Sequence, residues 1–456
     1  MDKYIEPHKE IDILATTEVL VVGGGPAGLS AAIAAAREGV KVLLIERFGC
    51  FGGMMTTAGV ESIAWWRHEK TVDAGGLARE FENEAQKMGA TSPEPQSVSQ
   101  AINAELFKVV ADKMVDDAGV NRLLHIFAVD VIKEDGTVKG VVTESKSGRK
   151  AILADRVIDC SGDADIAMFS GAPFTQPDKS EVMSVTTVFN CSNIDKQRFM
   201  DDIRASNPTY NDWGKDEDNK NWSYEIDKSC QKMFSPYLGK VFAKAKKEGL
   251  VPDGVTLGGS WSTITDYGDA NYMNVQSLAN IDCTNVFDLT TAEIEGRKQA
   301  LCAIEALRKM QPGFENARLK NFGMTVGTRE SRHIVGSTRL NENDIVNQGR
   351  HPDTIGIFPE FIDGNGMLKL PLEPRYFQIP YGALLPTGVE NLLVCGRAID
   401  SDPFAHATTR NMACCAVTGQ GAGVAAAISI KQKTTCRNVD IHIVQSALEK
   451  QGVKVF

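Results

Sequence analysis

Residues 18–46 read EVLVVGGGPAGLSAAIAAAREGVKVLLIE, and this stretch decides the fold. The apolar run at residues 19–22 predicts a buried strand that ends at a glycine-rich turn. An alanine-rich segment then predicts a helix to about Arg37, and residues 41–45 predict a second strand. A strand, a helix and a strand in this order indicate a βαβ unit with parallel strands.

The glycine spacing within this unit is typical of a dinucleotide-binding turn. Gly23 allows the tight turn, Gly25 lets the backbone approach a pyrophosphate, and Gly28 lets the helix pack closely on the strand. The free N–H groups at the helix start favour phosphate binding. Glu46 ends the second strand, where its carboxylate can accept hydrogen bonds from a ribose and would repel the 2′-phosphate of NADP.

Composition and charge indicate a globular enzyme with two domains, or one large domain with another inserted. The chain has 456 residues, of which 43% are hydrophobic and 24% charged, and its net charge is −10. This negative charge disfavours nucleic acid and membranes as partners. Residues 1–14 lack the apolar core of a signal peptide, so we expect a cytoplasmic protein. The apolar stretch at 413–430 predicts a buried helix rather than a membrane span.

The cysteines and histidines show no spacing typical of a metal site. The sequence has ten cysteines and seven histidines, without a C-x-x-C pair or a zinc or iron–sulfur pattern. We therefore predict that no metal is required. A disulfide reductase would need a redox cysteine pair and a second glycine-rich fingerprint, and the sequence shows neither. Cys50 alone leaves a single-thiol, peroxidase-like role open.

Further strand-like segments bear on whether the dinucleotide is NAD or FAD, and they favour FAD. Residues 131–133 and 138–143 flank a turn and predict a hairpin. Residues 156–160 predict a strand that runs into Ser161, Gly162 and Asp163, and residues 391–395 predict another that ends on Gly396 and Arg397. Small residues at strand ends allow close backbone approaches at one edge of the sheet, where open α/β folds bind ligands.

The chain resembles the FAD-dependent oxidoreductases of the glutathione-reductase-like superfamily, and four motifs carry the resemblance. The first spans residues 19–56, and many flavoproteins share it. The second spans residues 154–165. The third is GTRESR at residues 327–332. The fourth runs from residue 379 through Gly396 and Arg397 to His406, Arg410 and the GQGAG segment at 419–423. The third and fourth in this order are the more specific.

The resemblance implies a noncovalent FAD along the sheet edge. Its pyrophosphate would bind at the glycine-rich turn, and its adenine would lie beside Ala128 and Val129. The isoalloxazine would lie between residues 52–56 and the loop after Arg397, and residues 419–421 would begin or interrupt the last helix near the flavin. The implied cofactor contacts are Gly23, Gly25, Pro26, Ala27, Gly28, Glu46, Arg47, Gly52, Gly53, Met54, Thr56, Val129, Ser161, Gly162, Asp163, Gly396, Arg397, Gly419, Gln420 and Gly421.

The expected fold is α/β, with a Rossmann-like FAD-binding domain of the glutathione-reductase type and an inserted α+β substrate domain. We assign residues 1–60, 101–175 and 320–456 to the FAD-binding domain, and 61–100 and 176–319 to the substrate, or cap, domain. Residues 65–68 read WWRH and directly follow the predicted FAD loop. They form either a packed aromatic turn or a substrate-facing wall.

For catalysis, His406 is the predicted acid or base, because histidine titrates near neutral pH and this one follows the flavin loop. Arg410 and Arg397 would hold the flavin or a substrate carboxylate, or else cap a helix or pair with Asp400 or Asp402. Residues 329–332 are expected to form a buried ionic network. His68, also a predicted catalytic residue, and Glu61 are the alternatives to His406.

We therefore predict an FAD-dependent dehydrogenase or oxidase that moves a hydride between a small organic substrate and flavin N5. The electron acceptor is left open, and a homo-oligomer is compatible with the sequence. The alternatives are an electron-transfer subunit, which normally carries iron–sulfur ligands, and a non-enzymatic flavin-fold binding protein. An aromatic hydroxylase is less favoured, because such enzymes normally show Gly-Asp where this chain has Gly396-Arg397.

Overall fold

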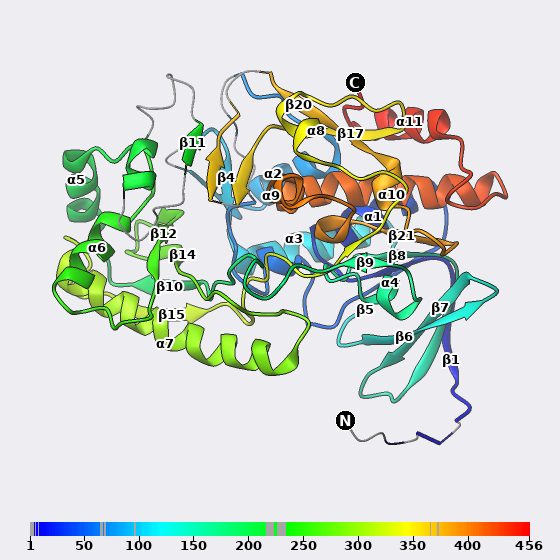
Figure 1. Ribbon diagram of the computed structural model, residues 1–456, viewed down its shortest axis with the longest axis horizontal. Coiled ribbons are helices and arrows are strands. Elements are labelled where there is room, and N and C mark those ends of the chain that lie inside the picture. The colour runs from blue at the N-terminus through cyan, green and yellow to red at the C-terminus, as the bar shows by residue number, and fades with distance from the viewer. Residues whose placement is uncertain are drawn as a thin grey trace.

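The computed structural model describes residues 4, 6–7, 9–63, 67, 70–94, 97–215, 223–225, 234–364, 366–371 and 374–456. A seven-stranded sheet with its helices forms one part of the molecule, and a five-stranded sheet with three helices forms the other (Figure 1). Their hydrophobic cores are separate. The predicted mixed α/β architecture with a Rossmann-like core is confirmed. The more specific assignment to the glutathione-reductase type remains a prediction.

The large sheet has the strand order β5-β2-β1-β8-β7-β6, and β21 also pairs with β8. Strands β5, β2, β1, β8 and β21 are parallel, whereas the β6–β7 hairpin adds to β8 in the antiparallel direction. The carboxyl ends of the parallel strands therefore meet at one edge. The strands are β1 (Ile13–Val22), β2 (Val42–Ile45), β5 (Asn121–Leu123), β6 (Phe127–Glu134), β7 (Thr137–Glu144), β8 (Lys150–Asp159) and β21 (Leu392–Val394).

The helices that pack in the core of this part include α1 (Pro26–Arg37), α2 (Gly76–Lys87), α3 (Ala104–Asp117) and α10 (Met412–Lys431). Helix α10 lies against α1, and two glycines make this approach possible (Figure 1). A Cβ atom at Gly419 would lie 2.0 Å from the carbonyl oxygen of Ala27, and one at Gly423 would lie 2.2 Å from that of Ala31. The glycines therefore serve the contact between the two helices.

This arrangement corrects the predicted role of residues 419–421. They lie inside a continuous helix that begins at Met412, so they neither begin nor interrupt it. Gln420 accepts a hydrogen bond from the Leu77 N–H at 2.8 Å and thereby caps the start of α2. Gly421 faces Ile355. None of the three lines the cavity described below.

We expect Gly419→Ala to destabilise the protein by about 1–3 kcal/mol, because the added methyl group overlaps the Ala27 carbonyl and forces the helices apart. Chemical denaturation of the flavin-free protein measures this change. Gly25→Ala is the matched control, since a Cβ atom there meets only Gly53 Cα, at 3.7 Å. Equal stability of the two variants would contradict the packing role.

Helix α10 also has the length and apolar composition of a membrane span. However, 94% of its most apolar window is buried inside the protein, which agrees with a core helix. Its alanines and glycines suit this position because small side chains allow close packing on α1.

The second part contains the sheet β12-β14-β10-β15, with β13 paired to β14. Its core is formed by residues between Phe189 and Ala317, where Phe199 makes edge contacts with Trp261 and Phe314. The elements are β10 (Phe189–Ser192), β12 (Leu257–Ser260), β13 (Thr263–Ile264), β14 (Ala270–Gln276), β15 (Arg318–Phe322), α5 (Lys196–Ser206), α6 (Gly239–Lys247) and α7 (Val286–Met310).

The described residues of 61–100 are not part of this second core. Leu77 and Phe81 of α2 are buried in the same core as α1 and α10, and Phe81 contacts Phe107 of α3 edge to face. Helix α2, which the sequence assigned to the cap domain, therefore packs with the large sheet, and the other predicted domain bounds remain predictions. The amphipathic pattern of α2 did not reveal which core it joins, because an apolar helix face can pack on either.

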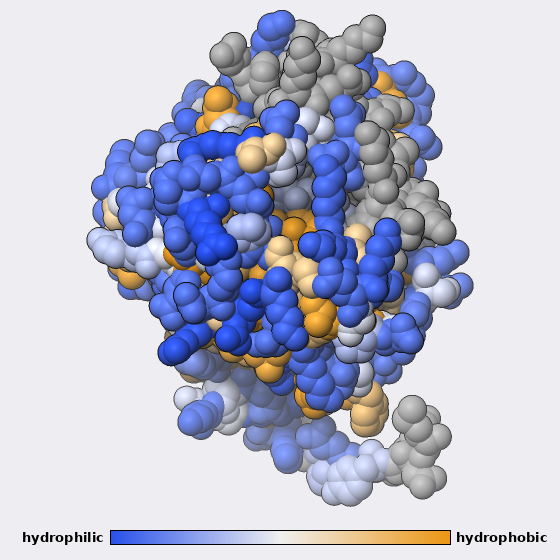
Figure 2. Space-filling view, turned by 90° about the vertical axis from the view of Figure 1, so that its left-hand side faces the viewer, coloured by the Kyte–Doolittle hydropathy of each residue, from blue (hydrophilic) through white to orange (hydrophobic). Residues whose placement is uncertain are grey.

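Shorter elements complete the structure. They are β3 (Thr91–Pro93), β4 (Gln100–Ile102), β9 (Phe174–Thr175), β11 (Ser223–Glu225), β16 (His333–Ile334), β17 (Thr354–Pro359), β18 (Ile362–Gly364), β19 (Met367–Lys369), β20 (Tyr376–Pro380), α4 (Asp165–Phe169), α8 (Glu342–Val346), α9 (Pro403–Thr409) and α11 (Ile441–Lys450). The face that carries the five-stranded sheet is mostly hydrophilic, with a few apolar side chains near its centre (Figure 2).

Candidate active site

A cavity of about 470 Å³ begins at the carboxyl edge of the large sheet and continues to the five-stranded sheet. Near the large sheet its wall is formed by the glycine-rich turn and the end of β2. Its far wall is formed by β12, by Trp261 directly after that strand, and by β14 with Tyr272 and Asn274. Open α/β sheets bind ligands at this edge, so the position agrees with the expected dinucleotide site.

The three fingerprint glycines have different surroundings. Gly23 has a φ of +102°, and a Cβ atom there would lie 2.4 Å from the Cys160 carbonyl oxygen. A Cβ atom at Gly28 would lie 1.7 Å from the Gly23 carbonyl oxygen. Gly25 instead has an ordinary φ of −73° and an open side toward the cavity. A bound phosphate can therefore approach the backbone at Gly25, whereas Gly23 and Gly28 are required by the turn itself.

Glu46 lies on the cavity wall in a fixed orientation. Its carboxylate accepts the Gly24 N–H at 2.6 Å and the Phe48 N–H at 2.9 Å. Burial raises the pKa of this carboxyl, although both N–H bonds oppose that shift. The remaining lone pairs can accept hydrogen bonds from a ribose.

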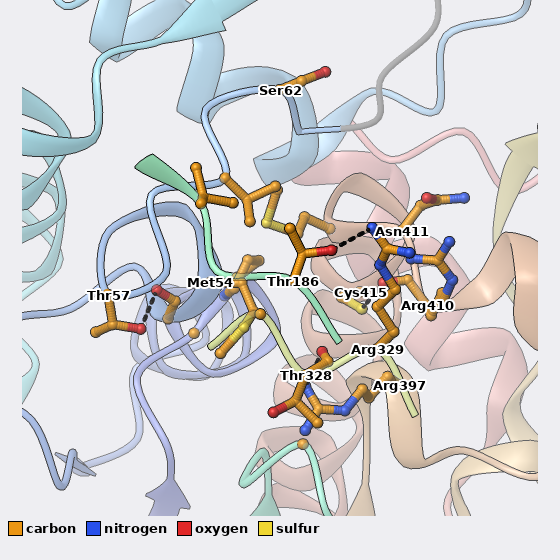
Figure 3. Close-up of a pocket in the computed structure, with 18 of the residues that line it drawn as sticks. Met54, Thr57, Ser62, Thr186, Thr328, Arg329, Arg397, Arg410, Asn411 and Cys415 are labelled. Carbon is orange, nitrogen blue, oxygen red and sulfur yellow. Dashed lines mark hydrogen bonds between the residues drawn. The ribbon is translucent and has the colours of Figure 1, made fainter. Parts of the chain in front are cut away.

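The loop after β2 places Met54 and Thr57 on the cavity wall (Figure 3). Thr56 was the predicted contact, but it is buried in the loop, where its hydroxyl donates to the Phe51 carbonyl at 2.7 Å. Gly52 is also off the wall, and its N–H donates to the Gly24 carbonyl at 2.8 Å. The threonine that lines the cavity is therefore Thr57, one residue after the predicted Thr56, because the sequence does not show how the loop turns.

A similar one-residue difference occurs on β6, where Phe127 and Ala128 line the cavity and Val129 does not. At the end of β8, Ser161 and Gly162 line the wall.

The next residue, Asp163, lies behind the wall and accepts hydrogen bonds from Arg397 and from Ser331 at 2.7 Å. Burial raises the pKa of Asp163, but Arg397 outweighs this and holds it below its usual range. Asp163 therefore orients Arg397, which faces the cavity.

A family model described as FAD dependent oxidoreductase matches residues 18–448. The chain belongs to this family. FAD is therefore its cofactor, as the sequence predicted, and the residues of the cavity fit it. Gly25 leaves space where a Cβ atom would otherwise stand, and the buried Nε of Arg397 has no hydrogen-bond partner.

Curated relatives match about a third of this chain. The thiamine thiazole synthase of Methanococcus vannielii is 34% identical over 162 residues, which cover 33% of this chain and 57% of that protein. The digeranylgeranylglycerophospholipid reductase of Methanospirillum hungatei is 30% identical over 173 residues, covering 35% of this chain and 42% of that protein. The chain thus matches less than two thirds of the length of these relatives.

Solved structures match nearly the whole chain at low identity. A geranylgeranyl bacteriochlorophyll reductase-like protein from Thermoplasma acidophilum is 16% identical, with a TM-score of 0.49 and coverage of 96% of this chain and 83% of that one. The flavin-dependent brominase Bmp2 gives a TM-score of 0.45 at 12% identity, with coverage of 95% and 83%.

The structure brings most of the predicted residues to one cavity. Those on its wall are Gly23, Gly25, Pro26, Ala27, Glu46, Arg47, Gly53, Met54, Ser161, Gly162, Gly396, Arg397 and Arg410. Those away from the wall are Gly28, Gly52, Thr56, Val129, Asp163, His406, Gly419, Gln420 and Gly421. His68 lies outside the described residues, as do Trp65 and Trp66.

His406 is 1% exposed and packs behind the cavity wall. Its Nε2 lies 3.0 Å from the Arg329 carbonyl oxygen, and its ring meets the edge of His333 at 4.4 Å between centroids. Burial lowers the pKa of His406 well below its usual value, and the charge of Arg410 adds to this effect. Its catalytic role remains a prediction, and this position favours a neutral histidine that supports the loop at Arg329.

His406, His333 and Glu330 form a group whose potential ligand atoms all lie within 4.8 Å of one another. The sequence spacing did not suggest this group, because His406 lies far along the chain from Glu330 and His333. Burial is the main cause that lowers the pKa of His406, and the positive charges of Arg410 and Arg397, which add to it, also disfavour a cation here. The absence of a required metal remains a prediction.

The predicted network at residues 329–332 is only partly ionic. Arg332 pairs with Asp165 at 3.0 Å, and Glu330 accepts the Met183 N–H at 2.9 Å. Arg329 instead lines the cavity. Glu61, an alternative base, lies off the wall, where burial raises its pKa to about 7 and the Ala104 N–H donates to it at 3.2 Å.

The cavity wall also contains titratable residues that the sequence did not single out. Glu94 is 8% exposed, and the Ser97 hydroxyl donates to it at 3.1 Å. Burial raises the pKa of Glu94 and raises that of Tyr272 to about 12. Tyr272 has a φ of +53°, a strained value for an aromatic residue, and such strain often marks functional sites.

Two cysteines also meet at the strand ends. The Sγ atoms of Cys160 and Cys395 lie 3.1 Å apart, although the residues are 235 positions apart in sequence. Burial raises the pKa of Cys160 well above its usual value, which makes the reactive thiolate scarce. Cys50 is buried off the cavity wall, and burial raises its pKa too. Neither site has the features of a reactive thiol.

Proposed function

We propose that this protein is an FAD-dependent dehydrogenase or oxidase that moves a hydride between a small organic substrate and flavin N5. The observation that carries this proposal is the continuous cavity. It joins the dinucleotide turn at Gly25 to a polar and aromatic wall on β14. Bound FAD supplies the two-electron chemistry, and the chain must bind the substrate and accept its proton.

The residues on the wall can divide this work. Arg397, oriented by Asp163, is available to the cofactor. Glu94 is our proposed proton acceptor, because it is a buried carboxyl on the cavity wall whose pKa is raised toward the working range of a general base. A substrate hydroxyl or amine would lose its proton to Glu94 as its hydride leaves.

We also propose a cytoplasmic protein of the glutathione-reductase-like superfamily whose partner is a small molecule. The net charge of −10 supports the absence of nucleic acid and membrane partners. The electron acceptor and the oligomeric state are left open.

Anaerobic flavin bleaching across a panel of small alcohols, amines and organic acids tests the proposed activity. We expect one class of compound to bleach the flavin band, and reoxidation with oxygen, a quinone or NAD then identifies the acceptor. A yellow protein that no organic compound reduces, but that exchanges electrons with a protein carrier, would instead indicate an electron-transfer subunit. A purified protein without flavin would favour a binding role.

A further inference from the structure

We propose that Arg329 and Arg410 form an anion site at the substrate end of the cavity, and that the substrate is a small monocarboxylate with an apolar body. That the bound anion is a substrate rests on the proposed function, but binding at the site can be tested without turnover. Both arginines line the cavity and lie close together in Figure 3.

The guanidinium groups of Arg329 and Arg410 carry two positive charges but have only one carboxylate partner among the described residues. Arg329 donates to neutral oxygens only, the Thr186 hydroxyl at 3.0 Å and the Asn274 amide at 3.3 Å. Among the described residues, no carboxylate lies within ion-pair distance of Arg329. Arg410 donates to the carbonyl of Asp363 and to its carboxylate at 3.3 Å. One carboxylate therefore faces two positive charges.

Two other arginines close to this part of the cavity each have a carboxylate partner of their own. Arg397 pairs with Asp163, and Arg332 pairs with Asp165. The Arg410 side chain is 12% exposed, and its Nε is buried without a hydrogen-bond partner. Burial of Arg329 lowers the pKa of its guanidinium group, and the positive charge of Arg410 adds to this shift. An anionic ligand would remove this repulsion.

The geometry favours a carboxylate over other anions. A guanidinium group offers a planar fork that matches two carboxylate oxygens, and charged hydrogen bonds of this kind are the strong ones. The unpaired charge is about one unit, which a monocarboxylate neutralises and a phosphate dianion exceeds. The neighbouring wall contains Trp261, Phe361 and Leu370, so the rest of the ligand should be apolar.

Titration of the FAD-loaded protein with benzoate, followed by the flavin difference spectrum, tests the site. Benzamide is the neutral match, and inorganic phosphate is the competing anion. We expect saturable binding of benzoate and at least about tenfold weaker binding of benzamide, because a charged hydrogen bond is lost. Equal affinity for benzoate and benzamide, or tighter binding of phosphate, would overturn the assignment.

Variants identify the arginines. Arg329→Met should weaken benzoate at least about tenfold and leave benzamide unchanged, and Arg329→Lys should recover part of the affinity. Arg204→Met is the control, because Arg204 is exposed on α5, outside the cavity. Unchanged benzoate affinity in Arg329→Met, or loss of FAD from both Arg329 variants, would overturn the anion site.

The outcomes separate this inference from the proposed activity. If benzoate binds as expected but no compound reduces the flavin, the anion site stands and the dehydrogenase or oxidase activity fails. If a neutral alcohol or amine reduces the flavin and carboxylates do not bind, the activity stands and the anion site fails.

Discussion

Gly25→Val is expected to give a folded protein without FAD. The native φ of −73° suits any residue, and a Cβ atom at this position meets only Gly53 Cα, at 3.7 Å. The protein itself therefore tolerates a side chain at Gly25. The valine methyl groups would instead fill the space where the backbone must approach the pyrophosphate.

Flavin absorbance and circular dichroism of the purified variant measure the two parts of this result. We expect a native-like circular dichroism spectrum and no absorbance band from bound flavin. Gly28→Val is the contrast, because its Cβ atom would lie 1.7 Å from the Gly23 carbonyl oxygen and should disrupt folding. Stoichiometric FAD in folded Gly25→Val would show that the pyrophosphate binds elsewhere.

Glu94→Gln is expected to slow flavin reduction by its substrate by about 10²- to 10⁴-fold, or roughly 3–5 kcal/mol of barrier. The amide keeps the size of the side chain and can still accept the Ser97 hydroxyl bond, but it cannot take a proton. FAD content and spectrum should remain unchanged. Anaerobic stopped-flow reduction measures the rate.

The pH dependence of the flavin reduction rate is an independent test of Glu94 as the base. Burial raises the pKa of Glu94, so the native rate should rise with pH through a pKa above the ordinary carboxyl range of about 4.3, as the base loses its proton. This limb should be absent from the Glu94→Gln profile. A native limb that persists in the variant would assign the proton transfer to another group.

His406→Gln tests the sequence-based prediction beside this one. Glutamine can still donate to the Arg329 carbonyl from about the position of the histidine Nε2, but it cannot act as a base near neutral pH. If Glu94 is the base, His406→Gln should reduce its flavin within about fivefold of the native rate. A loss comparable to that predicted for Glu94→Gln would instead support the catalytic role of His406.

The sequence by itself determined the βαβ unit, the cofactor and the buried character of α10. These features are local. The spacing of Gly23, Gly25 and Gly28 serves a single turn and the start of the helix that follows it. An apolar run such as residues 413–430 predicts burial whatever its neighbours in the fold. Strands β8 and β21, which end at Asp159 and Val394, also follow from short apolar runs bounded by small residues.

Only the tertiary structure decided which side chains face the cavity. Thr57 faces it instead of Thr56, and His406 lies behind its wall, because loop geometry and packing set those directions and no sequence period encodes them.

The same holds for residues that meet from distant segments. Arg329 lies in a loop after β15 and Arg410 at the end of α9, and their shared charge imbalance arises only where the two segments pack together. The sequence could name both arginines. It could not show that Arg410 has a carboxylate partner while Arg329 has none among the described residues, because that depends on contacts between segments far apart in the chain.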